Sequence, residues 1–307
     1  MATTLDGESK SEDASLPVEV IQRVVKKQRT TNTVAQDNVA KVKSQLDCIW
    51  NDAPENAPFV DNDGDPAWGP VVLCDRITWK DFDQWLDVFE GDVRRWIFEH
   101  VPGDDECGRV IIYSLPSDPH EATAGNIMQS IIEEIQTAGN SIGLIRSVQV
   151  KASPRCQIGS RRGKEPDMSI SPVGLTIGGR IMDNGKGFPF PNVVIEVAYK
   201  NESLDLLRGG LDNWMLPETS VQVAIGIKLF VRTRRQRRYR AILRVRNSPS
   251  QEVEFGIDVC EGSISLAFPL KLIYEGVPMP PALAGLDSPA ITIDLIALRD
   301  FLIDLPL

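Results

Sequence analysis

Residues 166–171 read PDMSIS and residues 191–200 read PNVVIEVAYK, and these two stretches determine the predicted fold. Asp167 stands at the start of a short predicted strand, and Glu196 interrupts the apolar run of a second one. Because side chains alternate along a strand, Lys200 points to the same face as Glu196 if the second strand continues that far. A buried carboxylate must be paired or bind a metal. The two stretches therefore indicate a polar site at adjacent strand ends.

Two carboxylates and a lysine in this arrangement are what a magnesium-dependent phosphodiesterase needs. The carboxylates of Asp167 and Glu196 would hold a Mg²⁺ or Mn²⁺ ion through oxygen. The metal would polarise the phosphate and lower the pKa of a bound water, and Lys200 would orient that water or neutralise developing charge. Two simpler interpretations stay open: Asp167 as a turn residue after a proline, and Glu196 with Lys200 as a structural ion pair.

The segment 119–139, capped by Ser117 or Asp118 and ended by Gly139, is predicted to be a helix that lies before this site. Its apolar residues centre on one direction at about 100° per residue, and His120 and Glu121 fall to either side of that centre. Either side chain could therefore face the carboxylates from the start of the helix. Glu133 points away from them.

The order of predicted elements favours an α/β fold of the α+β type with a mixed sheet. Further helices are expected at residues 79–91, 203–215 and 293–302, and strands at residues 108–116, 142–150, 167–170, 193–197, 221–231, 239–245 and 257–268. The strands 221–231 and 239–245 should pair antiparallel because the link between them is short.

Residues 1–70 form a predicted N-terminal extension, and residues 71–307 the main domain. The extension begins with a polar tail, contains helical periodicity over 16–30 and 38–50, and ends in a segment rich in proline, asparagine and aspartate. The two helices could form an arm through which the protein makes a homodimer.

Composition limits the possible classes of protein. The chain has 307 residues, 25% of them charged and 42% hydrophobic, and a net charge of −10, which is ordinary for a globular protein. It has no apolar run long enough to span a membrane and no secretory signal, so we expect an intracellular protein of the cytoplasm or nucleus. Its five cysteines are scattered singly, which favours a reducing compartment.

Residues from about 75 to 230 resemble the Uma-type restriction endonuclease family of the PD-(D/E)xK nuclease superfamily. The resemblance rests on an ordered set of segments, which read ITWKDFDQW, RRWIFEH, VIIYSLPSDPH, EPD, VIEVAYK and VQVAIGIKLF. It implies a restriction-endonuclease-like core in which Asp167 and Glu196 bind Mg²⁺ and His120 or Glu121 adds a group from the first helix.

One position departs from the superfamily pattern. The lysine normally lies two residues after the glutamate, where this chain has Ala198. Relatives often have the lysine in the following helix, where this chain offers Arg208, and Lys200 is the other candidate. If neither reaches the metal, the fold is catalytically inactive.

Residues 232–246, RTRRQRRYRAILRVR, contain eight arginines and no acid. Such a strip in a net-acidic chain suggests binding to a polyanion, because arginine pairs bidentately with phosphate. Four arginines are the predicted nucleic-acid contacts: Arg234, Arg235, Arg237 and Arg238. They should lie on the sheet face of the carboxylates or along its rim. The alternative is a solvated hairpin balanced by acidic neighbours.

The sequence therefore predicts a metal-dependent nuclease that hydrolyses phosphodiesters of DNA or RNA. The alternative is a catalytically degenerate nuclease fold that binds nucleic acid or protein without cutting. Ala198 and the net negative charge favour that alternative.

Overall fold

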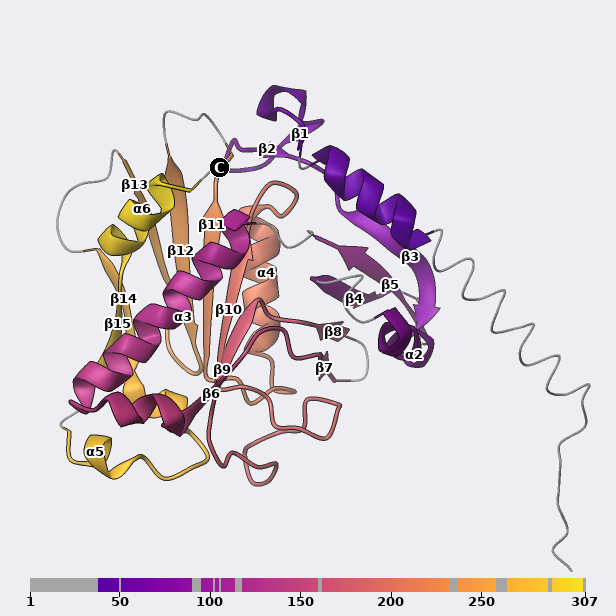
Figure 1. Cartoon of the computed structure of the whole chain (residues 1–307). Coiled ribbons are helices and arrows are strands. Elements are labelled where there is room, and N and C mark those ends of the chain that lie inside the picture. Colours follow the sequence, from indigo (N-terminus) through magenta and orange to yellow (C-terminus); the bar gives the residue numbers. More distant parts are fainter. Residues whose placement is uncertain are drawn as a thin grey trace, which may run out of the picture.

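In this computed structural model, the described residues are 38–305 apart from 50, 90–94, 102, 105, 114–117, 160–161, 232–236, 258–263 and 287–288. Two sheets dominate the structure: a six-stranded one flanked by helices and a smaller, five-stranded one beside it (Figure 1). The predicted α+β class with mixed sheets is confirmed. The predicted helix at 16–30 lies outside the described residues.

The six-stranded sheet is the larger part of the fold, with the strand order β13-β12-β11-β10-β9-β6. Its strands are β6 (Val148–Lys151), β9 (Met168–Pro172), β10 (Val193–Ala198), β11 (Val223–Leu229), β12 (Arg238–Val245) and β13 (Gln251–Gly256). Strands β10 and β11 are parallel and the other neighbours antiparallel, including the predicted pair β11–β12. Both central strands are buried along their whole length, as expected of strands covered on both faces.

One helix covers each face of this sheet. The helix α3 (Asp118–Ala138) packs through Ile127 and Ile131 on the face that carries Ile195. The helix α4 (Leu204–Trp214) connects the parallel strands β10 and β11 and packs on the opposite face, which carries Val194 and Ala198. The succession α3, β6, β9, β10, α4, β11 is consistent with a restriction-endonuclease-like fold.

The five-stranded sheet has the order β3-β5-β4-β8-β7 and is antiparallel throughout. Its strands are β3 (Val71–Thr78), β4 (Trp96–His100), β5 (Cys107–Ile112), β7 (Cys156–Ile158) and β8 (Arg162–Lys164). The helix α2 (Trp79–Phe89) places Trp79 and Phe82 against the rings of Trp96 and Phe98. A Cβ atom at Gly163 would lie 2.2 Å from the Trp79 ring, so glycine is needed where β8 passes under it.

Residues 38–49 are helical, as predicted, and bury Val39, Val42 and Leu46 in the core of the five-stranded sheet. The remaining elements lie outside the two sheets, and those that follow β13 add buried side chains to the core on the α3 face. They are η1 (Pro54–Asn56), β1 (Phe59–Val60), β2 (Pro66–Ala67), η2 (Ile142–Ser147), β14 (Ser265–Pro269), η3 (Leu270–Tyr274), α5 (Pro281–Ala284), β15 (Ala290–Asp294) and α6 (Leu295–Ile303). The Asp294 side chain begins α6 by accepting hydrogen bonds from the N–H groups of Ile296 and Ala297.

Two strand predictions were wrong in extent. The predicted strand 142–150 is a 3-10 helix followed by β6, because only Leu144 of its apolar side chains turns inward while Ile142 and Ile145 stay exposed. The predicted strand 257–268 corresponds to β14 alone, since the ladder of β13 with β12 ends at Gly256. Across the described part of the chain, every helix is too short or too polar to cross a membrane.

Candidate functional site

Asp167 lies immediately before β9, beside the strand that carries Glu196. Its backbone N–H donates to the Ile195 carbonyl at 3.0 Å, and its Oδ2 accepts the Val197 N–H at 2.5 Å. Its Oδ1 forms an ion pair with Arg95, which enters from the start of β4 and also donates to the Val197 carbonyl. The strand pairing thus places the two predicted carboxylates side by side, and both are buried.

Glu196 points to the α4 face of the sheet and meets a lysine that the sequence did not single out. Lys164, at the end of β8, has its Nζ 2.6 Å from Glu196 Oε1, and the Trp214 indole N–H donates to the same oxygen at 2.6 Å. The Lys164 ammonium also donates to the Gly210 carbonyl and lies 4.9 Å from the centre of the Trp214 ring. The cation beside Glu196 therefore comes from the five-stranded sheet.

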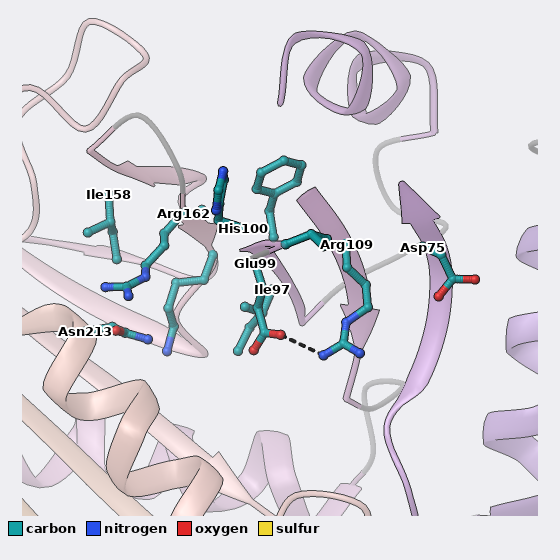
Figure 2. A pocket seen from close by; sticks show the side chains of 12 residues that line it. Asp75, Ile97, Glu99, His100, Arg109, Ile158, Arg162 and Asn213 are labelled. Atoms are coloured by element: carbon teal, nitrogen blue, oxygen red, sulfur yellow. Dashed lines mark hydrogen bonds and ion pairs between the residues drawn. The ribbon is translucent and has the colours of Figure 1, made fainter. Parts of the chain in front are cut away.

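A cavity of about 650 Å³ opens beside Lys164, between the five-stranded sheet and α4 (Figure 2). Figure 2 shows Arg162 directed toward Asn213 at one end and the ion pair of Glu99 with Arg109 toward the other. Lys164 is thus shared between this cavity and the carboxylates.

The expectation that Lys200 lies beside Glu196 has to be corrected. Strand β10 ends at Ala198, and Lys200 occupies a turn with a φ of 41°, so the strand alternation does not extend to it. Its ammonium donates to the carbonyls of Ile49 and Asp52, at 3.2 Å each, where the N-terminal helix ends. Burial lowers the pKa of Lys200.

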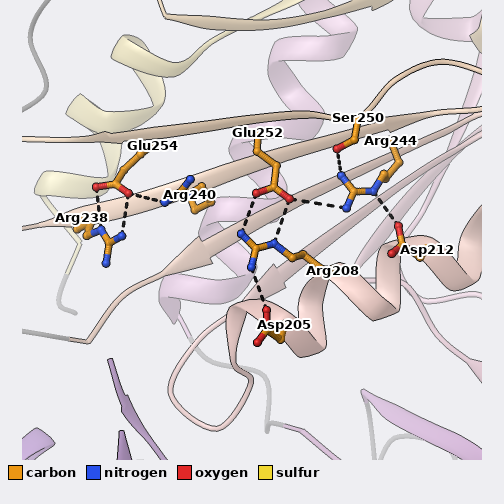
Figure 3. A network of polar contacts seen from close by, with 9 residues as sticks. All are labelled: Asp205, Arg208, Asp212, Arg238, Arg240, Arg244, Ser250, Glu252 and Glu254. Atoms are coloured by element: carbon orange, nitrogen blue, oxygen red, sulfur yellow. Dashed lines mark hydrogen bonds and ion pairs between the residues drawn. The ribbon is translucent and has the colours of Figure 1, made fainter. Parts of the chain in front are cut away.

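Arg208, the alternative cation, also lies elsewhere. It projects from α4 toward β13, where its Nε and Nη2 bind the two oxygens of Glu252 at 3.0 and 2.9 Å (Figure 3). Its Nη1 pairs with Asp205 at 2.9 Å. Arg208 and Asp205 lie three positions apart and therefore share one face of α4.

The start of α3 brings both predicted helix residues close to Asp167. His120 is 1% exposed, and its Nε2 lies 3.8 Å from Asp167 Oδ2. Within the described residues, neither ring nitrogen of His120 has a hydrogen-bond partner. Glu121 is exposed, and its negative charge contributes to raising the pKa of Asp167.

The pKa values of the three acids in this cluster are all raised. Burial is the main cause for Asp167, whose pKa rises to about 6 although Arg95 opposes the change. Burial also raises the pKa of Glu196, against the effect of Lys164. Glu202, just before α4, was missed in the sequence: burial, with the charges of Glu196 and Asp167, raises its pKa to about 8.

The arrangement of side chains does not fit a divalent metal. Among the described residues, no three His, Cys, Asp or Glu side chains converge as metal ligands would. Asp167 and Glu196 are already neutralised by Arg95 and Lys164, and a metal ion would have to compete with these cations. In this arrangement the two carboxylates are partners of cationic side chains and not ligands of a metal ion.

The described arginines of the strip lie largely in internal contacts. Arg237 donates to the carbonyls of Leu302 and Leu305, at 2.7 and 2.9 Å. Arg238 binds both oxygens of Glu254 at 2.8 Å (Figure 3). Arg234 and Arg235 are outside the described residues.

The neighbouring arginines of β12 continue this pairing. Arg240 shares Glu254 with Arg238, and Arg244 pairs with Asp212 of α4 at 2.8 Å. These side chains alternate with the buried residues of the α3 face, so they lie on the sheet face of Glu196. Arg246 instead donates to carbonyls near the end of α4, including that of Trp214.

No protein-family model matches the chain, and no curated protein matches it. Among solved structures, the chain is similar to the crystal structure of a candidate nuclease belonging to DUF820 from Anabaena variabilis ATCC 29413. The identity is 14% and the TM-score 0.37, over 67% of this chain and 90% of that one.

Proposed function

We propose that the protein is a nuclease of the PD-(D/E)xK type, related to the Uma family, that hydrolyses phosphodiester bonds of DNA or RNA. The observation that carries the proposal is the ion pair of Lys164 with Glu196, directly beside Asp167 on the neighbouring strand. Lys164 would take the role of the lysine that the superfamily usually has two residues after the glutamate, where this chain has Ala198. The three side chains come together at the end of β10 nearest to the start of α3.

The cations of the site are suited to a phosphodiester. In hydrolysis, a water oxygen bonds to phosphorus, the bond to one ester oxygen breaks, and the water gives up a proton. Lys164 and Arg95 would neutralise the charge that grows on the phosphoryl oxygens, because charge-assisted hydrogen bonds to phosphate are strong.

The proton of the attacking water needs an acceptor. His120 in its neutral form has an acceptor nitrogen, and Asp167 lies close enough to stabilise the imidazolium that results. The leaving oxygen then takes that proton from the imidazolium, which returns the site to its starting state.

A nuclease assay tests this proposal on single-stranded and duplex DNA and RNA. Lys164→Met and Glu196→Gln should lower the rate at least about 100-fold, which is typical for loss of one electrostatic or acid–base contribution. Lys200→Met is the matched control, since its ammonium serves the N-terminal helix. If Lys200→Met and Lys164→Met lose nuclease activity equally, Lys164 has no specific role in the site.

The same assay tests the requirement for Mg²⁺ or Mn²⁺ that the family resemblance implies. Activity that is abolished by a chelator and restored by Mg²⁺ would mean that a metal displaces Arg95 or Lys164 from a carboxylate. Activity that persists in the chelator would support the metal-free assignment of roles.

A second candidate function is a binding module that holds nucleic acid without cutting it. The observation that favours it is the neutralisation of both carboxylates by Arg95 and Lys164. Binding of Mg²⁺ to the native state would raise the melting temperature by mass action. No change at millimolar Mg²⁺, together with nucleic-acid binding and no cleavage, would select this function.

A further inference from the structure

The cavity beside Lys164 is separate from the carboxylates but shares that lysine with them. It is formed by three parts of the chain that are distant in sequence: β3 with β4 and β5, β7 with β8, and α4. Its volume of about 650 Å³ lies within the range of small-ligand sites, about 300–1,000 Å³. A space of this size can hold one nucleotide but not a base-paired duplex.

One end of the cavity is suited to an anion. Arg162 lines it, and no described residue forms an ion pair with that arginine. Figure 2 shows the guanidinium directed toward the side-chain amide of Asn213, so two sets of N–H donors converge there. Lys164 also lines this cavity. Arginine and amide donors at one place are the usual partners of a phosphate group.

The rest of the cavity combines apolar and polar groups. Ile97 and Ile158 line it with apolar side chains, against which the flat face of a base could lie. Glu99 and Asp75 offer acceptor oxygens for exocyclic amino groups.

We propose that this cavity binds a single nucleotide unit, with its phosphate at Arg162 and Asn213 and its base against Ile97 and Ile158. The nucleotide belongs to a single strand of nucleic acid, and an unpaired base at this position places the adjoining phosphate near Lys164. Enzymes that act inside a duplex extrude a base into a comparable pocket. The choice of a polymer over a free nucleotide rests on the proposed nuclease function.

Calorimetric titration of the full chain with the four nucleoside 5′-monophosphates tests the cavity itself, in low salt and with chelator. The nucleotides should bind, and the corresponding nucleosides should bind at least about 10-fold more weakly because they lack the phosphate. Arg162→Gln should lower nucleotide affinity about 10-fold or more. Arg146→Gln, an exposed arginine of η2, is the charge-matched control and should keep the parental affinity.

A second variant tests whether the cavity is the place of binding. Ile158→Trp fills it, and an unchanged circular dichroism spectrum would show that the variant folds. If Arg162→Gln and a folded Ile158→Trp both bind nucleotide as well as the parent, the proposal is overturned. Equal loss in Arg146→Gln and Arg162→Gln would also overturn it, since binding would then depend only on net charge.

Oligonucleotides separate this inference from the proposed nuclease function. Single strands should bind more tightly than duplexes of the same sequence. Removing one base should leave binding unchanged, because another base of the strand can enter the cavity. A strand with all bases removed should bind at least about 10-fold more weakly. Nucleotide binding without any cleavage would contradict the nuclease alone, whereas cleavage with an unchanged KM in Arg162→Gln and Ile158→Trp would contradict the cavity alone.

Discussion

Two clusters of ion pairs lie on the same face of the six-stranded sheet and differ in burial. The carboxylate cluster consists of Asp167 with Arg95 and Glu196 with Lys164. In this cluster, Glu196 and Lys164 are both at least nine-tenths buried. In the arginine ladder of β12, β13 and α4, the paired side chains of Arg238 and Glu254 are 35% and 36% exposed (Figure 3). The distances are similar, so the difference in burial must determine what each cluster does.

Burial reverses the effect of pairing on acidity. Hydrogen bonds from arginine lower the pKa values of Glu252 and Glu254 in the ladder. Burial raises the pKa values of Asp167 and Glu196 despite their cationic partners. The ladder therefore neutralises surface charge at low cost, whereas the carboxylate cluster keeps acids in a state that costs free energy. Ionisable groups whose pKa values are perturbed in this way are concentrated at functional sites.

The largest expected effect comes from breaking the buried pair. Lys164→Met leaves Glu196 as an uncompensated buried charge and should reduce the free energy of unfolding by about 3–5 kcal/mol. Arg208→Met, which removes the partly exposed partner of Glu252, should cost about 1 kcal/mol or less. Urea unfolding of both variants at pH 7 makes the comparison.

The double variant Lys164→Met/Glu196→Gln provides the check on this reasoning. It removes the buried charge together with its partner and should recover most of the lost stability. If the double variant is as unstable as Lys164→Met alone, the loss comes from packing of the lysine side chain and not from its charge.

Glu202 gives a pH-dependent effect of intermediate size. Its pKa rises from 4.5 to about 8, so between these values the native state holds more protons than the unfolded state, and stability falls as the pH rises. Glu202→Gln cannot ionise and should be more stable than the parent by on the order of 2 kcal/mol at pH 9, allowing for partial exposure. The two proteins should converge near pH 4, which thermal unfolding across this range would show. A constant difference at every pH would contradict the prediction.

Glu254 should show the opposite pH dependence and a smaller effect. Its pKa is lowered by Arg238, so the stability that it contributes is present above its ordinary value of 4.5 and is lost as the pH falls through the lowered one. Glu254→Gln should cost about 1 kcal/mol or less at pH 7 and nothing at pH 2. The same thermal measurements give this result, and a loss that grows on acidification would contradict it.

The sequence was sufficient to predict the helices and central strands around the two carboxylates, but not β4 and β8, which bring in Arg95 and Lys164. Apolar periodicity and capping residues predicted α3, α4 and the neighbouring strands, because those segments are buried by the same periodicities that form them. Adjacent positions for Asp167 and Glu196 followed from the same strand predictions. These features are local, and a single stretch of sequence contains them.

Of the two cations, Arg95 could not be predicted because it depends on a contact between distant segments, whereas Lys164 was overlooked. Arg95 meets Asp167 across 72 positions of sequence, and no local pattern marks it. Lys164 lies three residues before Asp167, in the stretch KEPD, and its proximity was a usable signal. Lys200 was misplaced because strand alternation was extended two residues beyond the end of β10.

The smallest expected effect concerns the arginine strip and nucleic-acid binding. Arg238 would have to exchange the carboxylate of Glu254 for a phosphate, and this exchange of one anion for another yields little free energy. Arg238→Gln should therefore leave the salt dependence of binding to single-stranded DNA nearly unchanged. Arg234→Gln and Arg235→Gln are the comparison, for which we predict a slope reduced by about 0.7 per arginine if each neutralises a phosphate. Fluorescence anisotropy between 50 and 200 mM salt (roughly the range in which such slopes are measured) resolves the two cases. If the slope falls as much for Arg238→Gln as for Arg234→Gln, the ion pairs of the ladder break so that its arginines bind nucleic acid. The arginines of the ladder would then act, like the carboxylate cluster, on the nucleic acid.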